Sequence, residues 1–176
     1  NTDKKNDQFK PYGATPGHGI EWARLIVQWA LSSFANRDGA RPYIDAAEHL
    51  FARAVDDAWN ADGAEGLVYT TDWNGTPVVT DRMHWTAAES LNTAATLHAA
   101  TGEARYANWY ATFARYVDEH VIDHEGGSWF HQLDGDNRVI GTVWPGKSDL
   151  YHAFQSTLIP FLDPAVSIAT AVKNAE

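Results

Sequence analysis

A unit of two helices and a β-hairpin recurs along this chain of 176 residues, and no other feature of the sequence constrains the fold as strongly. Apolar residues at helical spacing predict the helices, and Pro42 suits the first turn of the second one. Two β-prone runs flank Asn74-Gly75, which is a strong hairpin-turn signal. The predicted elements of this first unit are helices over residues 17–34 and 42–59 and strands over 67–72 and 76–80.

The same order of elements returns in the second part of the chain. A third unit begins at Ser148, where Asp149 is expected to cap its helix, and reaches only Pro160 before a helix-like tail over 164–175. The predicted elements of the second unit are helices over 83–100 and 104–121 and strands over 128–133 and 138–143.

Each first helix carries a histidine near its predicted N-terminus. These are His18, His84 and His152, which are 66 and 68 residues apart. Helix pairs of this kind bury their apolar faces only against neighbouring pairs, so they stack or close into a ring. Six pairs of about 64 residues each would need roughly 390 residues. We therefore expect residues 1–176 to be one half of a single ring-shaped domain, or an open solenoid.

Composition excludes several classes of function. The chain has 13 Lys and Arg against 23 Asp and Glu, and its net charge of −10 opposes binding to nucleic acid or to an anionic membrane. It contains no stretch of about 18 apolar residues. The absence of cysteine excludes disulfides and a thiol nucleophile, and it fits the cytoplasm. The 8 Trp, 7 Tyr, 7 Phe and 8 His suit contacts with sugars, although most of these rings are expected to fill the core.

Three ordered blocks resemble one protein family, the N-acylglucosamine 2-epimerase superfamily. Residues 17–22 match its Gly-His-x-x-Glu-Trp signature, residues 85–89 its Trp-x-x-x-Glu block, and residues 146–152 its Gly-Lys-Pro-Asp-x-Tyr-His block. The run at 11–18 is most similar to the aldose–ketose isomerase branch, which includes the D-mannose and sulfoquinovose isomerases. The resemblance covers nearly the whole chain.

The resemblance implies an all-α (α/α)6 barrel, with small β-hairpins between its helix pairs. The size of that fold agrees with the length extrapolated from the repeat. Residues 1–176 would then be the C-terminal half of a single catalytic domain. The N-terminal half would be supplied by the same or a separate chain, and a homodimer is an alternative arrangement.

The resemblance also implies roles for individual residues. His18 and His152 match the two catalytic histidines, and Glu21 matches a carboxylate that orients them or the sugar. The remaining matches are expected to contact the substrate: Trp85, Glu89, Lys10, Ser148 and Lys147. Ser148 stands where relatives usually have Pro or Gln, and Lys10 stands where Arg is common, so the specificity for the sugar is left open.

Interconversion of an aldose and a ketose explains why two histidines are needed. A proton leaves C2, another returns at C1, and protons also shift between O1 and O2. Imidazole, with a reference pKa of about 6.5, can take and return a proton near neutral pH. We assign C–H abstraction to His152 and ring opening or oxygen protonation to His18. Glu21 follows His18 by three residues, so it can hold the tautomer of that imidazole.

No metal or other cofactor is predicted for this chemistry. His120 and His124 have the spacing of a metal pair, but no carboxylate-rich site accompanies them. His84 is expected to pack beside Trp85, and His131 is expected, like the other unpaired histidines, to lie in a loop or in solvent. The resemblance therefore implies a cofactor-independent isomerase that interconverts D-mannose, or a related aldose, and D-fructose.

Three other functions remain open at this point. A sugar 2-epimerase of the N-acylglucosamine or cellobiose type would use the same pair of histidines. A glycoside hydrolase on the same fold would use two carboxylates, for which Asp72, Asp81 and Glu89 are candidates. A half-barrel could also be a non-catalytic protein that binds carbohydrate.

Overall fold

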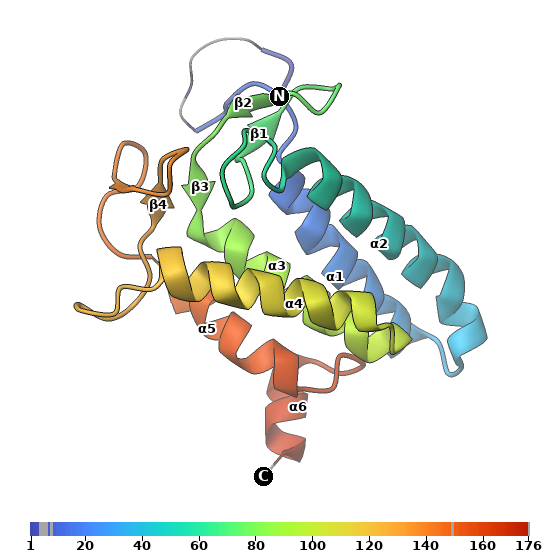
Figure 1. Cartoon of the computed structure of the whole chain (residues 1–176). Helices are drawn as coiled ribbons and strands as arrows, with labels where there is room; N and C mark the ends of the chain where they lie inside the picture. The colour runs from blue at the N-terminus through green and yellow to red at the C-terminus, as the bar shows by residue number, and fades with distance from the viewer. Residues whose placement is uncertain (4–6, 8, 149, 176) are drawn as a thin grey trace.

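The computed structural model describes residues 1–3, 7, 9–148 and 150–175, and its main elements are helices (Figure 1). Asp149, which was expected to cap the third helix, lies outside the described residues. The helices are α1 (Pro16–Ser33), α2 (Arg37–Ala58), α3 (His84–Thr101), α4 (Ala104–Tyr116), α5 (Leu150–Leu158) and α6 (Ile168–Asn174). The strands are β1 (Thr70–Thr71), β2 (Pro77–Val79), β3 (Arg82–Met83), β4 (Gln132–Leu133) and β5 (Val139–Ile140).

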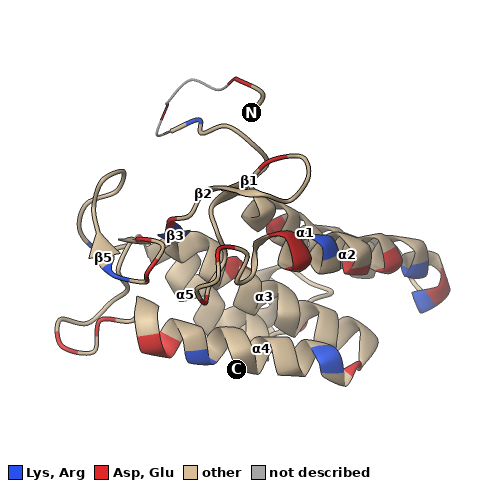
Figure 2. Cartoon of the chain, turned by 45° about the horizontal axis from the view of Figure 1, so that its top comes forward, with Lys and Arg blue, Asp and Glu red and all other residues tan. Residues whose placement is uncertain are grey.

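The helices are arranged in two layers, with α3 at the centre. α3 packs against α1 on one side and α5 on the other, while α2 packs against α1 and α4 against α3 (Figure 1). The outer helices α2 and α4 carry charged residues, as do the loops (Figure 2). Buried apolar side chains from both layers form one core, among them Ile20, Val27, Phe51, Leu91, Leu97 and Phe113. The chain is therefore an open arc of helix pairs, as the repeat predicts.

Helix starts follow the sequence closely for α1 and α3 but differ for two other helices: α6 begins at Ile168 and not at 164, and α2 also begins elsewhere than predicted. The second helix begins at Arg37 and not at Pro42, because the side chain of Asn36 caps it by accepting a hydrogen bond from the backbone N–H of Gly39 at 2.9 Å. Pro42 consequently lies inside α2, so the prediction of its place in the first turn was wrong. α4 ends at Tyr116, and a π-helical turn over Val117–Val121 completes the predicted length.

Both predicted hairpins are present, and the second joins an additional strand. β1 pairs with β2 across Asn74-Gly75. In the turn, the Asp72 carboxylate accepts hydrogen bonds from the backbone N–H groups of Asn74 (2.8 Å) and Thr76 (2.9 Å). β4 and β5 form the second hairpin, and β3 pairs antiparallel with β4. The second hairpin is thereby fixed to the residues that lead into α3.

A membrane-spanning element is not found among the helices of the described residues, since none is both long and apolar enough.

Two buried arginines hold the elements around α3 in place. Arg24 of α1 donates from Nε and Nη2 to the two carboxylate oxygens of Glu89 on α3, at 2.8 and 3.1 Å. Arg82 of β3 donates to both oxygens of Asp62, at 2.6 and 2.7 Å, and to the carbonyl of Ala64 at 3.0 Å. The first pair joins the two helices, and the second fastens the loop after α2 to the start of α3.

Loss of one partner of the Arg24–Glu89 pair is expected to lower the stability of the fold strongly. Its side chains are 5% and 0% exposed. Glu89→Leu should therefore lower the free energy of unfolding by about 3–5 kcal/mol, because it leaves a buried guanidinium without its carboxylate. The double variant Arg24→Met/Glu89→Leu should recover most of this loss in a urea titration. An equal loss in the single and double variants would contradict the interpretation.

The Asp62–Arg82 pair predicts a pH-dependent contribution to stability. The hydrogen bond from Arg82 holds the pKa of Asp62 below its usual value. A depressed carboxyl pKa stabilises the fold above the unfolded pKa of about 3.9, and this contribution is lost as the pH falls through the folded value. Asp62→Asn should cost about 2 kcal/mol at pH 7, and the difference from the unsubstituted chain should shrink below about pH 4.

The matched control for this prediction is Asp136→Asn, because Asp136 pairs with Arg138 where both side chains are exposed (66% and 72%). It should change the free energy of unfolding by less than about 1 kcal/mol at any pH. Denaturant titrations at several pH values measure both variants. A cost for Asp62→Asn that is the same at pH 7 and at pH 3 would rule out the electrostatic origin.

Candidate active site

The two histidines that were predicted to be catalytic lie against the same indole ring. His18 is in the first turn of α1 and His152 in the first turn of α5, while Trp85 is in the first turn of the central helix α3. The ring centroids of His18 and Trp85 are 4.9 Å apart, and those of Trp85 and His152 are 6.0 Å apart. The two imidazole centroids are therefore at most 10.9 Å apart, the sum of these distances. An open-chain sugar could contact both imidazoles.

These three rings are accessible from outside. His18 is exposed, and Trp85 and His152 are half-buried. Tyr69, which precedes β1, meets the edge of Trp85 at a centroid distance of 6.3 Å. Burial raises the pKa of the Tyr69 phenol, so it stays protonated and can donate a hydrogen bond near neutral pH. The sequence analysis missed Tyr69, whose only signal was its place in a β-prone run.

Two more histidines, His84 and His131, extend this group of packed rings beyond His152, and we call the whole group the ring cluster. The ring of His84 lies edge-on to His152 at 5.8 Å and edge-on to His131 at 4.5 Å. His131 in turn stacks on Trp144, at 5.6 Å and an interplanar angle of 13°. His131 is half-buried. It stands in a bend just before β4, in keeping with the predicted loop, but it contacts other rings and does not lie in solvent, because β3–β4 pairing brings it beside the start of α3.

The predicted contact between Glu21 and His18 does not form. Glu21 lies one turn further along α1 and is half-buried, but no hydrogen bond joins its carboxylate to that imidazole. Glu89 is placed differently from the expectation of a direct sugar contact. Its carboxylate is fully buried, and both oxygens are occupied by Arg24. Glu89 therefore joins the helix of His18 to the helix of Trp85, a role that the sequence analysis did not foresee for it or for Arg24.

The remaining predicted contact residues are spread around the loops. The ammonium group of Lys147 pairs with Asp123 and lies 4.4 Å from the centre of the Phe130 ring. The pKa of Asp123 is lowered to about 2, first by the backbone N–H of Gly126 and then by Lys147. Lys147 is thus committed to a structural contact and is not brought to the ring cluster.

The contacts of Lys10 and Ser148 do not assign either residue a role in sugar binding. The side chain of Lys10 is exposed in the segment before α1. Ser148 is half-buried, and its hydroxyl oxygen is buried without a hydrogen-bond partner among the described residues. A buried hydroxyl without a partner is destabilising. The hydroxyl of Ser148 is thus close to the start of α5 but is not exposed to a ligand.

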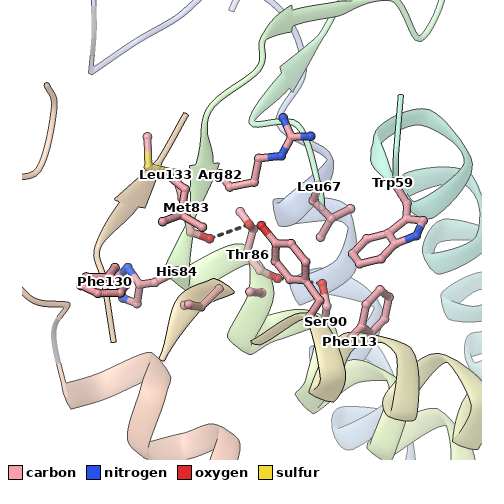
Figure 3. Close-up of a pocket in the computed structure, with 13 residues that line it drawn as sticks. Trp59, Leu67, Arg82, Met83, His84, Thr86, Ser90, Phe113, Phe130 and Leu133 are labelled. Carbon is pink, nitrogen blue, oxygen red and sulfur yellow. Dashed lines mark hydrogen bonds between the residues drawn. The ribbon is translucent and has the colours of Figure 1, made fainter. Parts of the chain in front are cut away.

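A small cavity borders the ring cluster at His84, which is one of its lining residues. This cavity lies between β3, the start of α3 and the end of α4 (Figure 3), and its volume is about 10 Å³. It is lined mainly by apolar side chains such as Leu67, Phe113 and Leu133. A space of this size holds about one water molecule and no sugar. A sugar would therefore have to bind on the open side of the cluster, where His18 and Trp85 are accessible.

One group of three possible metal ligands is found among the described residues, and it lies outside the ring cluster. Within the described ranges, the carboxylates of Glu65 and Glu119 and the ring of His120 have ligand atoms within 4.8 Å of one another. Arg115 already pairs with both carboxylates. A cation there would have to compete with a guanidinium that is permanently charged.

Comparison with known proteins gives a consistent result. The N-acylglucosamine 2-epimerase family model matches residues 1–156. A D-mannose isomerase from Pseudomonas cannabina pv. alisalensis is 45% identical over 100% of this chain and 43% of its own length. One from Thermobifida fusca is 44% identical over 98% of this chain and 42% of its own length. This chain therefore spans less than half the length of these curated relatives.

The fold agrees with this result. A crystal structure of D-mannose isomerase matches with a TM-score of 0.76 at 29% identity, over 88% of this chain and 38% of that chain. The predicted fold class is thereby confirmed: the helix pairs are part of an (α/α)6 barrel, with small antiparallel sheets between them. On the family match over most of its length, and on relatives that are similar from end to end, the chain belongs to the N-acylglucosamine 2-epimerase family.

Proposed function

We propose that this chain is the C-terminal half of a cofactor-independent aldose–ketose isomerase that interconverts D-mannose, or a related aldose, and D-fructose. The observation that carries the proposal is the placement of His18 and His152 against the single ring of Trp85. The similarity to two proteins named D-mannose isomerase supports the choice of sugar. The chemistry then follows from what two imidazoles can do to a hydroxyaldehyde.

His152 acts on the carbon chain in this mechanism. Its imidazole takes the proton from C2 of the open-chain aldose while the carbonyl oxygen O1 gains a proton, which gives an enediol. The imidazolium then returns its proton to C1, and O2 loses a proton to become the ketone oxygen. His18 exchanges the protons on the oxygens, and the face of Trp85 packs against the C–H groups of the sugar. Every proton that is removed is returned, so the reaction needs no net acid or base.

The arc has two open edges, at which the remaining helix pairs would dock. On α1, Trp22 and Trp29 are 59% and 50% exposed, and on the side of α5, Phe154 and Phe161 are 57% and 82% exposed. Large apolar side chains in such numbers are typical of an interface. We propose that an N-terminal half, in the same or a separate polypeptide, covers both edges. A second copy of this chain is the alternative.

Two features of the composition complete the proposal. A net charge of −10 disfavours nucleic acid as a partner, and the absence of cysteine suits the cytoplasm.

The observed contacts weaken the hydrolase alternative. Asp72 accepts backbone hydrogen bonds in the β1–β2 turn, Asp81 accepts a hydrogen bond from Gln132 at 2.6 Å, and Glu89 is occupied by Arg24. None of these three carboxylates lies in the ring cluster, whereas hydrolysis needs two that flank the bond to be cleaved. The 2-epimerase alternative differs only in where the proton returns, namely to the other face of C2.

The proposal predicts both a product and a position of the label. The chain should be joined to the N-terminal half of the Thermobifida fusca relative and incubated with D-mannose in deuterated water. Fructose should form and carry deuterium at C1, since the proton returned by His152 exchanges with solvent. His152→Ala and His18→Ala should each lower kcat/KM by about 10²–10⁴-fold. The control is His49→Ala, because His49 is exposed on α2.

Other products would change the conclusion. Glucose labelled at C2, without fructose, would identify an epimerase. A folded chimera that transforms neither D-mannose nor another aldose would leave a carbohydrate-binding protein and contradict catalysis. Full activity in His152→Ala would contradict the assigned base.

A further inference from the structure

The middle histidine of the three repeats is placed differently from the other two. His18 and His152 lie against Trp85 and are accessible, whereas His84, the first residue of α3, is 2% exposed. Its ring stands nearly perpendicular to those of His152 (81°) and His131 (86°). The buried ring of His84 thus packs edge-on against two other imidazoles.

The position of His84 is fixed from several sides. Its backbone N–H donates to the carbonyl of His131 at 3.1 Å, next to the pairing of β3 with β4. The ring of His131 is itself held between His84 and the parallel face of Trp144. His84 therefore belongs to the junction between the second hairpin and α3 and is in contact with both.

The imidazole of His152 rests on this junction. It lies in the first turn of α5 and meets three rings, those of Trp85, His84 and Tyr151. Tyr151 is on the same helix and is 59% exposed, so it constrains His152 weakly. Trp85 and His84 are consecutive residues of α3, and they contact His152 at different angles, 45° and 81°. Two such contacts restrict both the tilt and the rotation of the imidazole.

We propose that His84 is a positioning residue, which holds the imidazole of His152 against Trp85 by edge-to-face packing without touching the sugar itself. The importance of this role for turnover rests on the proposed function. Edge-to-face pairs of rings are favourable because the positive edge of one ring meets the negative face of the other. Correct orientation of a catalytic group matters strongly, since a displacement of about 1 Å can lower a rate by about 10²-fold.

The packing itself is tested on this chain by NMR, without any activity. In the unsubstituted chain, Overhauser effects should connect the ring protons of His84 and His152, and the protons of His152 should show ring-current shifts. His84→Ala should remove the part of these shifts that comes from the His84 ring and broaden the His152 signals, while the signals of His18 stay unchanged. His84→Phe, which keeps a planar ring, should restore a single orientation. Cross-strand Overhauser effects between β3 and β4 verify the fold of each variant.

Kinetics of the completed barrel then test the consequence for turnover. His84→Ala should lower kcat by about 10–100-fold while KM changes by less than about threefold, because ground-state binding does not need the exact orientation of the base. His84→Phe should recover at least half of the lost kcat on a logarithmic scale. His49→Ala, on the exposed surface of α2, serves as the control.

The outcomes separate the two proposals. Sharp His152 signals that report a single orientation in a folded His84→Ala chain would overturn the positioning role, whatever the activity. If Ala at this position prevents folding, the Phe variant decides: a mobile His152 in a folded His84→Phe chain would overturn it equally. An NMR effect as predicted, together with no isomerase activity in any form of the protein, would reject the proposed function and leave the packing role intact.

Discussion

The burial of α3 between α1 and α5 is the constraint on which the rest of the structure depends. Most side chains of this helix are inaccessible, including polar ones such as Asn92 and Thr93, which are fully buried. A helix that is covered on all sides can have only one rotation and one register relative to its neighbours. The first turns of the three helices therefore meet at one end of the arc. Three rings from separate repeats come together there because each repeat places its aromatic or histidine residue in the first turn.

The buried arginines explain how this end keeps its shape. Arg24 and Glu89 fix α1 against α3 about two turns below His18 and one turn below Trp85, and Arg82 fixes the loop after α2 to β3. A buried ion pair is stabilising only when nearly all of its donors and acceptors are hydrogen-bonded. This requirement restricts the distance and orientation of the elements that carry the two residues. The cluster is thus supported from below by an ion pair and from the side by the β3–β4 junction. This arrangement suits a site that has to hold two imidazoles at a set separation.

Much of the fold could be predicted because its signals are local or periodic. Apolar spacing located α1 and α3 within one residue at their starts, and the repeat located His18, His84 and His152 at one end of the arc. β3 was missed because a strand of two residues has no periodicity, and its pairing with β4 is a tertiary contact. The start of α2 was placed too late, because Pro42 was weighed above the cap at Asn36.

The candidate site was predicted less completely, because its contacts are tertiary and leave no local or periodic signal in the sequence. The partners Arg24, Tyr69 and His131 come from separate elements, and no spacing in the sequence links them to Trp85 or His152. Glu89 has helical spacing to Trp85 that suits a sugar contact, but the choice between a sugar and Arg24 depends on how α1 packs. Family resemblance supplied the candidate residues, and only the packing distinguished those that reach the surface from those that support them.

The account depends on two imidazoles and one indole forming a single site. The most direct measurement is the change of the NMR signals of His18, His152 and the Trp85 indole as D-fructose is added to the completed barrel. All three should shift together along one binding curve, while His49 and His98 on the outer surface stay unchanged. Shifts in only one of the two imidazoles, or separate curves for His18 and His152, would contradict a shared site.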